Sequence, residues 1–261
     1  MAAEGKSKEP FTDDAALGGR LTLRQPARGH RFGHDAILLA AATPAAAGEV
    51  AVDLGAGVGA AGLALARRVS GLTVRLVEID PELAGLAGEN AARNGLGDRV
   101  TAHALDVAAP LAAFAAAGLG PQCADRVLMN PPFHEAGRAQ ASPDARRRVA
   151  HVAPPGALAT WFGTAARLLR STGTLTLIHR ADGLGELLGL LEPAFGAVAI
   201  QPVHPRPGAA AIRILLRAAK GSRAPLIHLP GLVLNRDDGR PSAEAESVLR
   251  EGAALPLAQL P

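Results

Sequence analysis

Short apolar runs, each followed by a stretch that favours a helix, recur along the middle of the chain. The first run is Val50–Leu54, which contains an acid near its end, and a glycine-rich turn follows it at 55–59. The chain then continues as Ala60–Arg68, which is rich in alanine and leucine. Apolar runs of this length are typical of buried strands, and alanine-rich stretches are typical of helices. The pattern therefore predicts a strand, a tight glycine turn and a helix, the opening unit of a doubly wound α/β domain.

The same alternation continues to about residue 217. Since parallel strands need helical crossovers, it predicts an α/β fold with a mostly parallel, seven-stranded sheet and helices on both faces. After the first strand, we expect the others at 73–78, 99–104, 125–129, 174–178, 197–203 and 210–216. Helices are expected at 81–95, after Asp106 to about Gly118, at 158–169 and at 183–192, and one more short strand at 226–229.

Shorter features precede and follow this domain. The pair Gly18-Gly19 lies between two short runs and predicts a β-hairpin, and the next helix, 36–42, ends before Pro44. The C-terminal part is rich in proline, which predicts little independent core. We therefore expect a disordered tail (1–10), a hairpin and helix cap (11–47), the main domain (48–217) and a C-terminal appendage (218–261).

The composition is that of a globular protein and restricts the classes of site and partner. Of 261 residues, 48% are hydrophobic and 20% are charged, which argues against disorder. The net charge of +3 permits an anionic partner such as a nucleic acid without requiring one. Cys123 is the only cysteine and His134, His151 and His204 are scattered, so we predict no disulfide and no metal site. No apolar segment reaches membrane-spanning length, so we expect a cytoplasmic protein without membrane contact; no pattern indicates an oligomeric state.

Acidic residues stand at the ends of three successive predicted strands: Asp53, Glu78 and Asp106. The carboxyl ends of parallel strands share one edge of the sheet, where the ligands of open α/β folds bind. Several carboxylates beside a glycine turn suit a ligand with an amino group, a ribose diol and an adenine, and they would repel a pyrophosphate. S-adenosylmethionine has these groups and no phosphate. The simpler alternative is that Glu78, like Asp35 earlier in the chain, caps the helix that follows it.

A dinucleotide-binding protein such as a dehydrogenase is the competing reading of the glycine turn. Residues Gly57–Gly62 satisfy the pattern G-x-G-x-x-G, which by itself is a weak signal. Here the pattern begins two residues after Gly55 and extends into the predicted helix, and Asp53 stands just before the turn. These features favour S-adenosylmethionine over a dinucleotide.

The tetrapeptide Asn130-Pro131-Pro132-Phe133 follows the fourth predicted strand, beside the expected ligand. The two prolines stiffen the turn and fix the direction of its carbonyl groups. Asn130 offers an amide oxygen as a hydrogen-bond acceptor, and Phe133 offers a flat face for stacking. Together these groups suit a planar substrate that bears an amine. The alternative is a proline-rich turn without a catalytic role.

Residues 53–59 match the first motif of the class I S-adenosylmethionine-dependent methyltransferases, which the chain resembles over about 35–217. The resemblance implies a Rossmann-like fold and S-adenosylmethionine as cofactor, with Glu78 at the ribose and Asp106 near the adenine. The Asn-Pro-Pro-aromatic motif is similar to that of amino-methyltransferases, and implies that Asn130, Pro131, Pro132 and Phe133 are catalytic. The cofactor-binding residues that it implies are Asp35, Asp53, Gly55, Ala56, Gly57, Gly59, Glu78, Ile79, Asp106, Val107 and Asn130.

The N-terminal run Arg31–Leu39 resembles the bacterial valine-tRNA adenine-37 amine methyltransferase family. This resemblance implies that the substrate is an exocyclic amine of adenine in tRNA, and that Asp35 and its neighbours close over the cofactor. Phe133 stands where that family often has Tyr, and stacking survives this change. The likeness extends over about 11–235, and the later segments that carry it are 204–206, 213–216 and 220–221.

Three other functions fit the same motifs. Ribosomal-RNA guanine amine methyltransferases carry a similar Asn-Pro-Pro-Phe-His sequence, although they usually have a second, duplicated domain for which this chain has no room. A protein-glutamine methyltransferase would need little basic surface. Outside the enzymes, the chain could be a non-catalytic module that binds cofactor and RNA, although the intact motif at 130–133 argues against it.

An RNA substrate needs basic side chains that contact phosphates. The loop at 134–154 and the end of the main domain are rich in such residues, and a solvated surface is the alternative reading of them. The candidates are Arg138, Arg146, Arg147 and Arg148 in the loop, and Arg206, Arg213, Arg217, Lys220 and Arg223 later in the chain.

Overall fold

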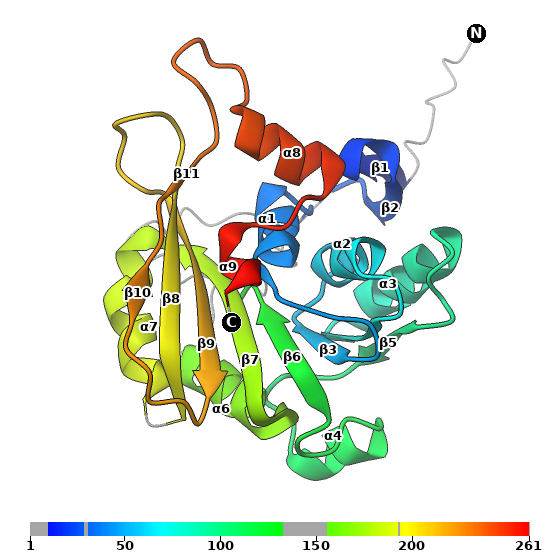
Figure 1. Cartoon of the computed structure of the whole chain (residues 1–261). Helices are drawn as coiled ribbons and strands as arrows, with labels where there is room; N and C mark the ends of the chain where they lie inside the picture. Colours follow the sequence, from blue (N-terminus) through cyan, green and yellow to red (C-terminus); the bar gives the residue numbers. More distant parts are fainter. Residues whose placement is uncertain (1–9, 29–30, 133–155, 193, 261) are drawn as a thin grey trace, which may run out of the picture.

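The computed structural model describes residues 10–28, 31–132, 156–192 and 194–260. A mostly parallel sheet runs through the middle of the molecule (Figure 1). Its strands lie in the order β10-β8-β9-β7-β6-β3-β4-β5, with β11 paired to β8, and β9 runs antiparallel to both of its neighbours. The strands are β3 (Val50–Leu54), β4 (Thr73–Glu78), β5 (Val100–Ala104), β6 (Ala124–Met129), β7 (Leu169–Arg180), β8 (Phe195–His204), β9 (Arg213–Lys220), β10 (Ile227–His228) and β11 (Leu232–Val233).

The chain reverses its direction across the sheet at β3. From β3 it continues through β4 to β5 on one side, and then adds β6 on the other side of β3. Leu54 at the end of β3 pairs with Val77 on β4 and with Met129 on β6. The ends of these three strands therefore meet at the topological switch point, where open α/β sheets bind their ligands.

Two apolar layers pack against the sheet, because successive side chains of a strand point to opposite faces. On β3, Ala51 joins one buried cluster, and Val52 and Leu54 join the other. Helices α1, α2 and α3 belong to the first layer, and α4, α6 and α7 to the second (Figure 1). Across the described part of the chain, no helix is long and apolar enough to cross a membrane. The helices are α1 (His34–Ala42), α2 (Ala60–Arg68), α3 (Pro81–Arg93), α4 (Leu111–Ala116), α6 (Ala157–Leu168), α7 (Leu184–Leu191), α8 (Ala243–Glu251) and α9 (Pro256–Gln259).

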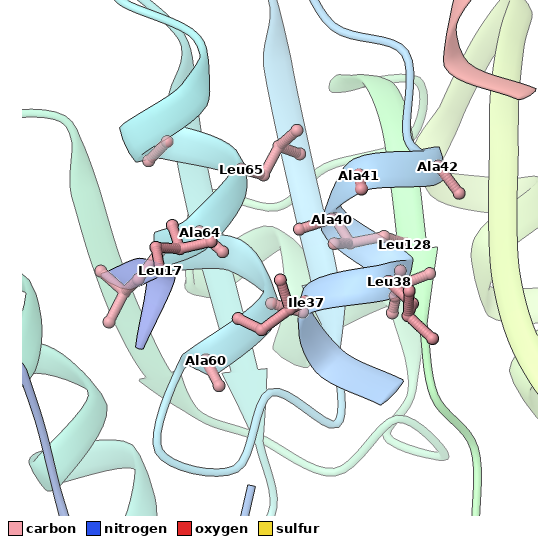
Figure 2. Packing of buried hydrophobic residues seen from close by; sticks show 14 of the residues in the cluster. Leu17, Ile37, Leu38, Ala40, Ala41, Ala42, Ala60, Ala64, Leu65 and Leu128 are labelled. Atoms are coloured by element: carbon pink, nitrogen blue, oxygen red, sulfur yellow. The ribbon is translucent and has the colours of Figure 1, made fainter. Parts of the chain in front are cut away.

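Helix α1 is buried on several sides because α2 and β6 pack against it and the C-terminal segment covers it. Figure 2 shows Ile37 and Leu38 of α1 among side chains of α2 and Leu128 of β6. The C-terminal segment covers another side, where the Leu255 N–H donates to the Ala41 carbonyl at 2.9 Å. Residues beyond 217 therefore contribute to the same core as the central domain.

The N-terminal strands β1 (Phe11–Ala16) and β2 (Leu21–Pro26) form the expected hairpin. Its turn contains Gly18 and Gly19, with φ of 63° and 89°. Glycine adopts positive φ without the steric cost that a Cβ would add. The hairpin lies against α3, to which it is tied by hydrogen bonds described below.

The predicted α/β class and mostly parallel sheet are confirmed, but the described sheet has nine strands rather than seven. The additional strands, β10 and β11, have two residues each, which is too short to produce a hydrophobic pattern. The expected short strand at 226–229 overlaps β10. The strand expected from 210 begins only at Arg213.

Candidate functional site

The loop between β3 and α2 forms the centre of the site. Gly55, Gly57 and Gly59 all have positive φ, at 70°, 56° and 88°. The backbone N–H groups of Gly55 and Ala56 donate to the Val77 carbonyl at 2.8 and 3.0 Å. The glycine turn predicted from the sequence is therefore held against the end of β4, in a conformation that suits glycine.

Asp53 lies buried directly before this loop. Its Oδ2 accepts a hydrogen bond from the Gly62 N–H at 2.8 Å, which fixes the first turns of α2 to β3. Burial raises the pKa of Asp53 from 3.8 to about 7; the Gly62 hydrogen bond opposes this shift, and the nearby Glu78 charge adds to it. Direct contact between Asp53 and a cofactor stays a prediction.

Glu78 reaches across from the end of β4 to the glycine loop. Its Oε2 accepts from the Gly57 N–H at 2.8 Å, and its Oε1 accepts from the Asp80 N–H at 3.0 Å. The alternative that Glu78 caps the next helix is wrong, because Asp80 is the N-cap of α3 and accepts from Glu82 and Leu83. Glu78 thus presents a mostly buried carboxylate beside the loop, as a ribose-binding acid requires.

Residues on the next two loops could hold an adenine ring. Ile79 follows Glu78 and is 53% exposed, which is unusual for a large apolar side chain in this protein. Val107 is buried, and its neighbour Asp106 accepts from the Ala108 N–H at 2.8 Å. An aliphatic side chain and a carboxylate on adjacent strand ends suit the face and the amino group of a purine.

Asn130 follows β6, next to the glycine loop. Met129 pairs with Leu54, so Asn130 follows β6 at the same edge of the sheet at which the glycine loop follows β3. The Oδ1 atom of Asn130 is buried and has no hydrogen-bond partner within the described ranges. An unsatisfied buried acceptor costs free energy, so this atom is suited to accept from a bound ligand. Phe133, predicted as the stacking residue, lies outside the described residues.

Asp35 lies in the first turn of α1 but does not cap it. The N-cap is Gly33, and the Asp35 carboxylate instead accepts from Arg213 Nε at 2.9 Å. This ion pair joins the start of α1 to the start of β9, at the same edge of the sheet as Asn130. The capping interpretation is therefore wrong, while contact with the cofactor stays a prediction.

Among the described residues that were expected to bind phosphates, Arg217 and Lys220 do not lie with the others at the site. Arg217 is largely buried and donates to the carbonyls of Leu257 and Leu260, which holds the C-terminal segment in place. Lys220 lies at the far end of β9, away from the site, and donates to the Leu169 carbonyl at 2.6 Å. Arg206 and Arg213 remain at the edge that carries the site, and the loop at 134–154, with His134 and His151, lies outside the described residues.

Sequence reasoning did not single out Trp161 of α6, which contacts the glycine loop. A Cβ built on Gly55 would lie only 2.4 Å from Cη2 of this indole, so the ring lies directly against the glycine loop. The feature of the sequence that distinguishes this residue is that Trp161 is the only tryptophan in the chain. Among the residues that the structure describes, no group of three or more His, Cys, Asp or Glu side chains could hold a metal ion.

These features together fit S-adenosylmethionine. The loop offers glycine backbone for close approach, Glu78 offers a carboxylate for hydroxyl groups, and Ile79 offers an apolar surface for a purine. The strand-end carboxylates do not favour a pyrophosphate, which a dinucleotide would bring.

Comparison with known proteins agrees with this assignment. The model of the family described as "Methyltransferase small domain" matches residues 31–201. A tRNA1(Val) (adenine(37)-N6)-methyltransferase of Porphyromonas gingivalis is 34% identical over 161 residues, which are 60% of this chain and 61% of that protein. A release factor glutamine methyltransferase of Chlorobaculum tepidum is 32% identical over 158 residues, 57% of this chain and 51% of that protein. The chain thus spans less than two thirds of the length of these relatives.

Two solved structures have the same arrangement of strands and helices. A predicted O-methyltransferase from Agrobacterium tumefaciens superposes with a TM-score of 0.71 at 30% identity, covering 85% of this chain and 98% of that one. A 16S rRNA N2 G methyltransferase of T. thermophilus, solved with AdoMet and guanosine, gives a TM-score of 0.57 at 25% identity, covering 80% and 50%.

Proposed function

This chain belongs to the methyltransferase small domain family, and from that premise we propose that it transfers a methyl group from S-adenosylmethionine to an exocyclic amine, that of an adenine in tRNA. One observation carries the proposal. The buried Oδ1 of Asn130 has no partner in the described part of the chain and lies beside the glycine loop, where an amine would meet the methyl donor.

We assign the cofactor to the edge formed by β3, β4 and β5. Backbone of the loop at 55–59 would hold the amino acid part, Glu78 would accept from the ribose hydroxyls, and Ile79, Val107 and Asp106 would surround the adenine. When bound, S-adenosylmethionine supplies a methyl group on a sulfonium centre. Asp35 is paired with Arg213 at the same edge, and we propose that it covers the site from the side of α1.

Asn130 and Pro131 then orient the substrate amine. An exocyclic amine is a poor nucleophile because its lone pair is conjugated with the ring. If the amine donates its two N–H groups to Asn130 Oδ1 and to the Pro131 carbonyl, the lone pair localises on nitrogen and points toward the methyl group. The bound cofactor would supply the methyl group, and because the amine proton would become acidic only once the nitrogen is methylated, the site would need no strong base. Most of the rate enhancement comes from positioning and oriented dipoles.

Our choice of substrate is based on the relatives and not on the motif alone. Adenine, guanine and glutamine amide nitrogens all present a planar N–H₂ group, so the Asn-Pro-Pro turn by itself does not choose between them. The adenine methyltransferase of Porphyromonas gingivalis matches 60% of this chain, and the release factor glutamine methyltransferase matches 57%. A base within a stacked tRNA loop must be turned out of its stack to reach Asn130, with Phe133 as the stacking partner. A tRNA substrate implies that the enzyme acts in the cytoplasm.

The test supplies methyl-labelled S-adenosylmethionine with undermodified tRNA, ribosomal RNA or release factors in separate reactions. Label recovered from tRNA as N6-methyladenosine is the expected result. Label in ribosomal guanine or in glutamine would be consistent with the proposed role of Asn130 but would contradict the proposed tRNA substrate. Cofactor binding without transfer to any of the three would support the non-catalytic module.

The variant Asn130→Ala tests the role of the amide oxygen. Its turnover should fall by about a hundredfold or more, because the acceptor that orients the amine is lost. Its affinity for S-adenosylhomocysteine, measured by calorimetry, should change little. Asn130→Asp is the matched control: it keeps an acceptor oxygen at the same place and should retain more activity than the alanine variant. Near-normal turnover of Asn130→Ala would rule out the proposed mechanism.

A further inference from the structure

The indole of Trp161 occupies the space that a side chain at Gly55 would need. An ideal Cβ on Gly55 would lie 2.4 Å from Cη2, 3.1 Å from Cζ3 and 3.4 Å from Cζ2 of the ring. The outer edge of the six-membered ring is therefore what faces the first glycine of the loop. Gly55 is thus constrained twice, by its φ of 70° and by the ring beside it.

A second contact anchors the same face of α6 to another loop of the site. Thr164 lies three residues after Trp161, on the same side of the helix, and its Oγ1 donates to the Val107 carbonyl at 2.9 Å. Arg167 donates to Thr164 Oγ1 at 2.7 Å and supports this arrangement. One face of α6 therefore touches both the β3–α2 loop and the β5–α4 loop.

Trp161 differs from the other large apolar residues of α6 in its exposure. Leu158, Phe162 and Leu168 are almost fully buried in the second apolar layer. Trp161 packs against that layer but keeps part of its surface open to solvent. A partly exposed indole therefore lies in contact with a loop that we assign to the cofactor.

We infer that Trp161 is a cofactor-contacting residue, whose indole forms an apolar wall of the S-adenosylmethionine site between the β3–α2 loop and the β5–α4 loop. This inference rests on the placement of the cofactor given above. A large, rigid aromatic surface favours contact with a purine or a ribose, and its electron-rich face also attracts a cationic group. The indole would thus contribute to affinity for the product S-adenosylhomocysteine, which keeps the adenosyl group, as well as for the donor.

The intrinsic fluorescence of the chain can be used to detect this contact. Trp161 is the only tryptophan and the chain has no tyrosine, so its emission dominates the intrinsic fluorescence. The full chain is titrated with S-adenosylhomocysteine, and the same titration is followed by calorimetry. We expect the emission to change in intensity or wavelength and to saturate with the dissociation constant that calorimetry gives. Calorimetric binding with unchanged emission would overturn this inference alone, whereas absence of any binding would overturn the placement of the cofactor as well.

A pair of variants separates contact from packing. Trp161→Leu removes the aromatic surface and should weaken S-adenosylhomocysteine binding by about five- to tenfold. Phe162→Leu, at the next position of α6, removes a buried ring that faces the apolar layer and should leave the affinity within about twofold. Equal weakening in both variants would show that Trp161 acts only through packing. If Trp161→Leu does not fold, the fluorescence titration of the unaltered chain still decides the question.

Discussion

At the scale of single residues, Asp53 is the residue of the site whose pKa is shifted furthest from its ordinary value. Its pKa in the folded chain is about 7, against an ordinary value of 3.8, chiefly because burial disfavours the charged form. The folded chain therefore keeps this proton to a higher pH than the unfolded chain does. It follows that the contribution of Asp53 to stability decreases as the pH rises from about 4 to about 7 and is constant above that.

The variant Asp53→Asn tests this dependence. The amide keeps an oxygen that can accept from the Gly62 N–H but does not titrate. We expect the free energy of unfolding of the unaltered chain, relative to the variant, to fall between pH 4 and pH 7, by more than about 1 kcal/mol. Denaturant titrations of both proteins at a series of pH values measure this difference. A difference that does not vary with pH would contradict the assignment.

Alanine variants of Gly55 and Gly57 distinguish the effect of backbone strain on stability from the effect of a steric clash. Both have positive φ, but a Cβ at Gly55 would meet the Trp161 ring at 2.4 Å, whereas a Cβ at Gly57 has nothing within 4 Å. Gly55→Ala should therefore lower the free energy of unfolding by about 1–3 kcal/mol more than Gly57→Ala. Chemical denaturation of the two variants without cofactor makes the comparison. Equal losses would mean that the indole moves aside easily.

At the scale of elements, the N-terminal hairpin is joined to the glycine loop through one side chain of α3. The Asn90 amide donates to the carbonyls of Val58 and Arg24 at 3.0 and 2.9 Å, and its Oδ1 accepts from the Arg24 N–H at 2.7 Å. Asn94, one turn later, makes a similar pair of bonds with Thr22 but does not reach the loop. The hairpin therefore supports the cofactor loop through Asn90.

Exchange of these two amides for carboxylates tests that support. Asn90→Asp would place a second oxygen against two carbonyl groups, so it should cost about 3 kcal/mol of stability and also weaken S-adenosylhomocysteine binding. Asn94→Asp should destabilise the hairpin while the affinity stays nearly unchanged. Calorimetry and thermal unfolding of both variants are the measurements. If both variants bind the ligand equally well, the hairpin has no influence on the loop.

At the scale of the whole molecule, the two ends of the chain meet over α1. Arg20 in the hairpin turn donates to the Arg250 carbonyl of α8 at 3.1 Å, and Leu257 of α9 is fully buried. Figure 1 shows α8 beside the hairpin and α9 against α1. The C-terminal segment thus stabilises the helix whose first turn carries Asp35.

Removal of one side chain from each region tests how far the C-terminal segment belongs to the core. Leu257→Ala should lower the free energy of unfolding by about 2–5 kcal/mol, because it opens a cavity in the core shared with α1. Leu226→Ala, at a position that is 42% exposed, should change it by less than about 0.5 kcal/mol. Denaturant titrations distinguish the two. A loss at Leu257 as small as that at Leu226 would show that α9 is only loosely attached.

The local pattern of the sequence was sufficient for the fold class and for the order of the chemical groups. Apolar runs that alternate with helix-forming stretches predict a parallel sheet, and parallel strands bring their carboxyl ends to one edge. The glycine turn, Glu78 and Asn130 could therefore be placed near one another without coordinates. Each depends only on where a strand ends, which a short window of sequence determines.

Contacts between distant segments were decided by the tertiary structure alone. Asp35 pairs with Arg213, 178 residues later, and Trp161 meets Gly55 because α6 crosses back over the sheet. Arg217, which the sequence suggested as a phosphate contact, is instead enclosed by the C-terminal segment. Periodicity reports which face of an element is buried, but not which other element covers it. That partner depends on strand order and on the paths of the connections, which are set when the whole chain packs.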